Sequence, residues 1–208
     1  TLTRPFVGPL GCSVVLRGGG RWTQYRRSET DSMPSLTEDR WVGELGFDVS
    51  RAFARTYAVD RPDWNMHRLR HVSRIQLQYR WHPGGGDLAD AIPDYDDFVY
   101  IARRPVLDLA DITHTDGLRE WNVARIGWEN SILAAGQDSA YRDYLSFNLY
   151  QDILFSASDY ADEWDALYAE LDYKPFPWLD LQWRQKIATE QEETEAAYLR
   201  AILHSADL

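Results

Sequence analysis

Apolar and polar residues alternate between His67 and Trp81, and this pattern constrains the fold of the chain more than any other feature. A period of two places successive side chains on opposite faces of a β-strand. Pro83 and the three glycines after it end the segment. The pattern therefore predicts a strand with one apolar face and one polar face.

Four other segments in the first half are predicted to be strands. Cys12–Leu16 and Arg21–Arg26 flank Gly18-Gly19-Gly20, which indicates a β-hairpin with a glycine loop. Alternating apolar residues predict a strand over 41–49, and a short apolar run predicts another over 98–102.

The stretch from Val49 to Ala58 fits two interpretations. Val49, Phe53 and Tyr57 stand four residues apart, which suits a helix, but they also share the parity of a continued strand. The alanines between them are poor strand formers, so we expect a short helix that ends before Pro62.

The hydrophobic period changes to that of a helix near residue 115. Four helices are expected, over 116–136, 138–155, 158–171 and 179–204. The second is apolar nearly all round between Tyr141 and Phe155, as in a helix at the centre of a bundle or covered by a partner.

Together these segments predict an α+β fold. A small antiparallel sheet would occupy a β-rich region, residues 1–110, and about four helices would form an acidic helical region, residues 111–208. The helices follow the strands and do not alternate with them, which argues against parallel α/β folds. The two regions either pack as one domain or remain separate.

Net charge narrows the range of partners. The chain carries 22 Lys and Arg against 33 Asp and Glu, a net charge of −11. Residues 105–208 account for this excess, with 7 cations and 20 acids. Acidic surfaces repel phosphate groups, so we expect neither a nucleic-acid partner nor a membrane partner.

Targeting signals and cysteine content bear on location. No run of about 18 apolar residues is present, and no cleavable signal peptide is recognisable. Cys12 is the only cysteine, which excludes an intramolecular disulfide and favours a reducing compartment or a virion. The expected location is therefore the cytoplasm or a virion.

Signatures of catalysis and metal binding are weak. His67 and His71 share one side of a strand or helix, and with His82 they offer an alternative interpretation as a metal or acid–base site. Flanking arginines, such as Arg68 and Arg70, disfavour a divalent cation there. We expect no cofactor, no metal and no catalysis.

Aromatic residues are abundant, with 9 Trp, 12 Tyr and 7 Phe. Trp, Tyr and Arg are enriched at protein–protein interfaces. The interface candidates lie on predicted loops or polar segments: Trp22, Trp64, Trp81, Trp178, Trp183, Arg103 and Arg104.

These features predict a non-catalytic structural or assembly subunit that contacts other protein chains, as a homo- or hetero-oligomer. The larger complex would be a phage virion or a multi-subunit machine. The first alternative is an enzyme that uses the three histidines. The second is a carbohydrate- or ligand-binding module, because aromatic side chains also stack on sugar rings. A third is an acidic inhibitor that mimics nucleic acid with the helical half. Metal content tests the first alternative, and glycan binding tests the second.

Overall fold

The computed structural model describes residues 2–27, 36–64, 66–83, 104, 106–111, 121–136, 140–155, 166–189 and 194–204. The regular structure of these residues is nine strands and two 3₁₀ turns, with no α-helix. The bounds are β1 Leu2–Val7, η1 Pro9–Gly11, β2 Ser13–Arg27, β3 Leu36–Arg61, η2 Pro62–Trp64, β4 Met66–His82, β5 Trp121–Ala135, β6 Tyr141–Leu154, β7 Ala166–Phe176, β8 Leu179–Ala188 and β9 Thr194–Leu203. Within these ranges we find no helix with the length and apolar character needed to cross a membrane.

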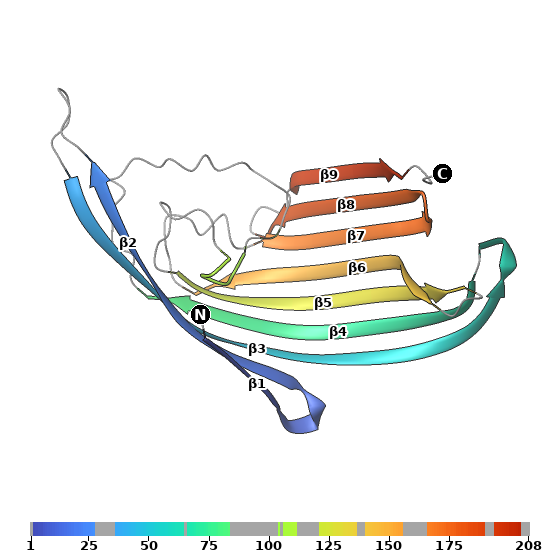
Figure 1. Cartoon of the computed structure of the whole chain (residues 1–208), viewed down its shortest axis with the longest axis horizontal. Helices are drawn as coiled ribbons and strands as arrows, with labels where there is room; N and C mark the ends of the chain where they lie inside the picture. The colour runs from blue at the N-terminus through green and yellow to red at the C-terminus, as the bar shows by residue number, and fades with distance from the viewer. Residues whose placement is uncertain are drawn as a thin grey trace.

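All nine strands form one antiparallel sheet in chain order, so every strand lies beside its neighbours in the sequence. Figure 1 shows a strongly curved sheet with β1 and β9 at its two edges. The turns η1 and η2 and residues 177–178 lie at one end, which we call the short-turn end. The strands β2, β4, β6 and β8 end at the opposite end, which we call the long-loop end.

Strand register separates two faces of the sheet. Asp48, Gln78, Arg125 and Asp152 stand side by side in one row across β3 to β6. The adjacent row contains Val49, Leu77 and Ile126, whose side chains point to the other side. We call the first side the polar face and the second the apolar face.

The buried core is small and lies on the polar face. Residues 106–111 pack there, and Leu107 contacts the buried Trp121 and Val123. Leu109 packs on Val42 of β3. A third buried cluster, Tyr150, Ala166 and Tyr168, lies on the same face of β6 and β7, while the opposite face carries most of the large exposed apolar side chains.

The prediction of an α+β fold is wrong. The segments predicted as helices over 116–136, 138–155, 158–171 and 179–204 contain β5 to β9, which extend the sheet begun by β1 to β4. The helical interpretation failed because apolar side chains occur on both faces of these strands. In β5, Trp121 and Val123 lie under residues 106–111 while Ile126 and Trp128 are exposed on the apolar face.

Two predictions in the first half need correction as well. Gly18-Gly19-Gly20 lies inside the single strand β2 and does not form a hairpin loop. The expected helix after Val49 is part of the 26-residue strand β3, where pairing with β4 outweighs the low strand propensity of alanine. The predicted strands over 41–49 and 67–81 are confirmed, and the one predicted over 98–102 lies outside the described residues.

Candidate functional site

The apolar face exposes large hydrophobic side chains on successive strands. Leu45 and Phe53 on β3, Ile75 on β4 and Ile126 and Trp128 on β5 are each about half exposed, between 46% and 54%. Other exposed members are Leu16, Trp22, Trp41, Tyr57, Leu77, Trp81, Ile153, Leu199 and Leu203. Contiguous apolar patches of more than a few hundred Å² are uncommon on isolated proteins and mark contact surfaces.

Aromatic side chains gather at both ends of this face. At the long-loop end, Trp22 pairs with Trp41 across β2 and β3, and Trp81 pairs with Leu45. At the short-turn end, rings touch from Trp64 to Tyr144 and Phe176, from Tyr144 to Tyr173, and from Phe176 to Trp178. We call these sets the long-loop aromatic group and the short-turn aromatic group.

Carboxylates are separated from the apolar face. By the strand register, the acids of the central strands lie on the polar face: Glu44, Asp48, Glu129, Asp152, Glu170 and Asp172. Between the two aromatic groups, the described residues of the apolar face include no Asp or Glu. The arginines there include Arg51 and Arg55, whose guanidinium groups lie over the rings of Phe53 and Tyr57.

Four charged groups on the polar face form a neutral quartet. Arg17 Nε lies 2.7 Å from Asp48 Oδ2, and Arg17 Nη1 lies 3.0 Å from Asp108 Oδ2. The fully buried Arg80 reaches the same two carboxylates, at 2.7 Å and 2.6 Å. Because Asp108 belongs to residues 106–111, the quartet ties this segment to β2, β3 and β4.

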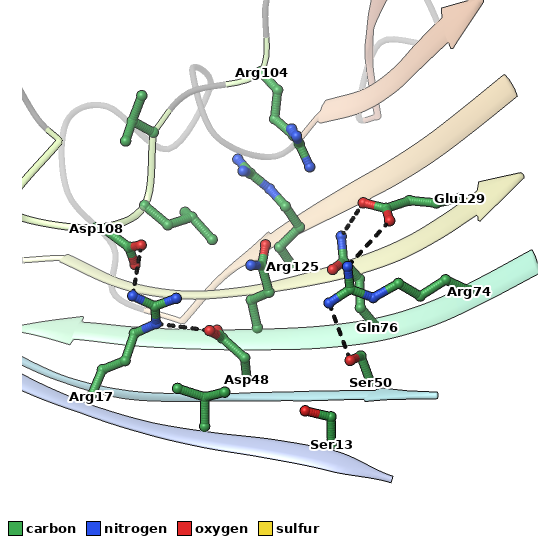
Figure 2. A pocket seen from close by; sticks show the side chains of 14 residues that line it. Ser13, Arg17, Asp48, Ser50, Arg74, Gln76, Arg104, Asp108, Arg125 and Glu129 are labelled. Carbon is green, nitrogen blue, oxygen red and sulfur yellow. Dashed lines mark hydrogen bonds and ion pairs between the residues drawn. The ribbon is translucent and has the colours of Figure 1, made fainter. Parts of the chain in front are cut away.

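A polar pocket lies beside the quartet, as Figure 2 shows. Its volume is about 420 Å³, and Arg17, Asp48, Arg74, Arg125 and Glu129 are among its lining residues. Glu129 is held from several sides, because Oε1 accepts hydrogen bonds of 2.9 Å from Gln76 Nε2 and Tyr150 OH. Gly127 permits this arrangement, since a Cβ there would lie 2.8 Å from both Gln76 and Tyr150.

Arg125 and Asp152 form the most buried ion pair beside the pocket. Arg125 Nε and Nη2 donate to the two Asp152 oxygens at 2.5 and 2.6 Å, and the two side chains are 3% and 0% exposed. This bidentate geometry satisfies both carboxylate oxygens. Asp152 is therefore a structural partner of Arg125.

The charged groups that line the pocket are engaged with one another. Its carboxylates Asp48, Asp108 and Glu129 all pair with arginines, and the described residues of its lining include neither His nor Cys. Neither Ser13 nor Ser50 therefore has a histidine base among the lining residues. Within the part of the chain that the structure describes, no group of three His, Cys, Asp or Glu residues could hold a metal ion.

The five tryptophans named from the sequence lie on the apolar face or at its ends. Trp22 and Trp81 belong to the long-loop aromatic group, and Trp64 and Trp178 to the short-turn group. Trp183 is half-buried on β8, between these groups. The structure thus places all five on one continuous surface.

The other candidate residues are dispersed. His82 is buried on the polar face, where Trp121 Nε1 donates to its Nδ1, while His71 lies on the apolar face near Asn130. His67 pairs with Asp60, so the three histidines do not meet at one site. Arg104 lies with its guanidinium carbon 3.6 Å from the Tyr150 ring centroid, and Arg103 lies outside the described residues.

Sequence reasoning missed the aliphatic part of the apolar face and the quartet. Ala124, Ile126 and Trp128 at every second position carried a signal for a small piece of the aliphatic part, but the helical interpretation hid it. The quartet joins four residues from distant segments of the chain, so no local pattern could have found it.

Comparisons with protein families, with characterised proteins and with solved structures find no match for this chain. The function is therefore argued from the two faces of the sheet.

Proposed function

We propose that this chain is a non-catalytic structural component of a larger assembly, which holds it through the apolar face. One observation supports the proposal: large hydrophobic side chains are half exposed on strand after strand of one sheet face. Such a surface is costly in water, and covering each half-exposed Leu or Ile contributes roughly 1 kcal/mol.

The polar face supports the same proposal. Its arginines and carboxylates are engaged with one another in the quartet, in the Arg125–Asp152 pair and around Glu129. A face whose charges neutralise one another stabilises the sheet and keeps few groups free for acid–base chemistry. These contacts favour a structural role over the enzyme that was considered from the three histidines.

Self-association in plain buffer tests this proposal. The purified chain, free of lipid and detergent, should form species larger than the 24.1 kDa monomer in sedimentation experiments. The double variant Leu77→Thr/Ile126→Thr replaces two cross-strand partners on the apolar face and should raise the monomer fraction several-fold. Threonine keeps the β-branched shape that suits a strand while adding a hydroxyl group.

Val106→Thr is the matched control. Val106 is 47% exposed, nearly as much as Ile126 at 48%, but it lies beside the pocket on the polar face. This variant should sediment like the unmodified chain. A monodisperse monomer of the unmodified chain at high concentration would refute the proposal.

A further inference from the structure

We infer that the occupant of the apolar face is the hydrocarbon of a lipid bilayer, with the polar face turned toward water. This inference rests on the proposed function and names the partner that covers the face. Three separate features of the sheet support it: the position of its aromatic groups, the distribution of its charges and the length of its strands.

The aromatic groups lie where a bilayer would place them. Trp and Tyr are favoured at both boundaries between hydrocarbon and water, because the ring is apolar and the N–H or O–H group remains hydrated. On this sheet Trp22, Trp41 and Trp81 lie at one end, and the ring cluster around Trp64 and Tyr144 lies at the other. The middle holds aliphatic residues such as Leu77 and Ile126, together with two tryptophans, Trp128 and the half-buried Trp183.

The distribution of charged side chains on the apolar face also fits a bilayer. Hydrocarbon does not solvate a carboxylate, and the described residues of the apolar face between the aromatic groups contain none. Arg55 lies on the part of β3 nearer the short-turn end. Arg51 stands in the row of Ile75 and Trp128, and its guanidinium lies over Phe53, which is two residues nearer that end. Their long side chains rest on aromatic rings and can extend to lipid phosphates at the boundary.

Strand length fits a hydrocarbon layer. β7, β8 and β9 contain 11, 10 and 10 residues. A tilted strand of about 9–11 residues crosses the hydrocarbon of a typical bilayer. β4, β5 and β6 are longer and would extend beyond it.

A protein partner explains these features less well. Protein–protein interfaces contain about one hydrogen bond per 100–200 Å², with a polar rim around a more apolar core. The apolar face instead presents aliphatic and aromatic residues from β2 to β9, with polar residues such as Arg51, Gln151 and Gln185 in a minority. A lipid surface requires no matching hydrogen bonds.

Contact with the hydrocarbon of a bilayer would also explain why the chain acts within an assembly. Among the described strands, β1 and β9 each pair on one side only. Lipid supplies no hydrogen bonds to the other edge, so in a bilayer these edges need neighbouring strands. The assembly would provide those strands, while lipid covers the face.

This inference departs from the expectation, drawn from net charge and the length of apolar runs, that no membrane is involved. A strand exposes every second residue to one side, so it needs no continuous apolar run. The acids of the central strands face the other way, and net charge therefore does not describe the surface in contact with lipid.

A site-specific fluorescent label tests the occupant. In the full chain with Cys12→Ser, which removes the native cysteine, Ile126→Cys places a label on the apolar face. Val106→Cys, at a residue of equal exposure beside the polar-face pocket, is the control. Both proteins are refolded into phosphatidylcholine vesicles, with and without bromine at the middle of the acyl chains.

The label at residue 126 should be quenched by brominated lipid and protected from iodide in water. The label at residue 106 should be quenched by iodide and unaffected by brominated lipid. Residue 126 accessible to iodide and insensitive to bromine would overturn the inference. If residue 126 is protected from iodide but insensitive to bromine in the presence of vesicles, within an oligomer that stays free of lipid, then lipid is the wrong occupant and the proposed function stands. A stable monomer with residue 126 accessible would refute both.

A charge on the apolar face gives a second, quantitative test. Ile126→Lys should lower the fraction of chain folded into vesicles by at least about thirty-fold, because lysine is costly on the lipid-facing side of a strand. Val106→Lys should leave that fraction within about two-fold of the unmodified chain. Equal insertion of the two variants would contradict lipid contact at residue 126.

Discussion

Asp152→Asn is expected to lower the free energy of unfolding by about 3–5 kcal/mol. Asp152 is fully buried and receives two hydrogen bonds from Arg125, which is itself 3% exposed. The amide that replaces the carboxylate carries no charge, so the Arg125 guanidinium would stay buried beside a neutral partner. Urea titration of the protein refolded in detergent micelles measures the loss.

Asp39→Asn is the matched control for this variant. Asp39 is exposed and accepts a 3.0 Å hydrogen bond from Gln24, so its replacement should cost less than about 1 kcal/mol. The double variant Arg125→Met/Asp152→Leu should recover most of the loss, because it removes both buried charges together. Equal effects of Asp152→Asn and Asp39→Asn would contradict a buried ion pair.

Gly46→Ala is expected to destabilise the sheet by about 3 kcal/mol. A Cβ at residue 46 would lie 2.3 Å from the Tyr79 carbonyl oxygen and 2.8 Å from Arg80 Cδ. The carbonyl belongs to the backbone of β4 and cannot move without disturbing the pairing of β3 with β4. The added methyl group would also displace the Arg80 side chain, which links Asp48 to Asp108.

Gly18→Ala provides the comparison within the same sheet. A Cβ at Gly18 would meet its nearest atom, Leu45 Cδ2, at an ordinary 3.8 Å. This variant should change stability by less than about 1 kcal/mol, because alanine fits a strand at least as well as glycine does. Thermal unfolding of both variants in the same micelles tests the difference. A Gly46→Ala variant as stable as Gly18→Ala would contradict the close packing of Arg80 over β3.

Whether a strand was predicted correctly from the sequence depended on whether its apolar residues lie on one face or on both faces of the sheet. β4 was predicted because Ile75, Leu77, Tyr79 and Trp81 all lie on one face, which keeps the period of two visible. β5 was predicted as a helix because its N-terminal part buries Trp121 and Val123 on the other face. β9 was predicted as a helix because its sequence, TEAAYLRAIL, consists largely of helix-forming residues. Pairing with β8 decided its conformation.

The candidate surface was predicted in part. The abundance of tryptophan pointed to an interface, and the structure places Trp22, Trp64, Trp81, Trp178 and Trp183 on or beside one apolar face. The aliphatic residues between them could not be collected from the sequence. Their grouping depends on the register of eight strand pairs, which is a property of the whole sheet.

The sequence by itself determined the alternation of the clearest strands, the excess of aromatic residues and the surplus of acids. Only the tertiary structure decided that the second half joins the same sheet and that the acids of the central strands share one face. The physical reason is that a strand has no hydrogen-bonding partner within itself. Its conformation, and the side to which each residue points, are set by neighbouring strands that can lie far away in the chain.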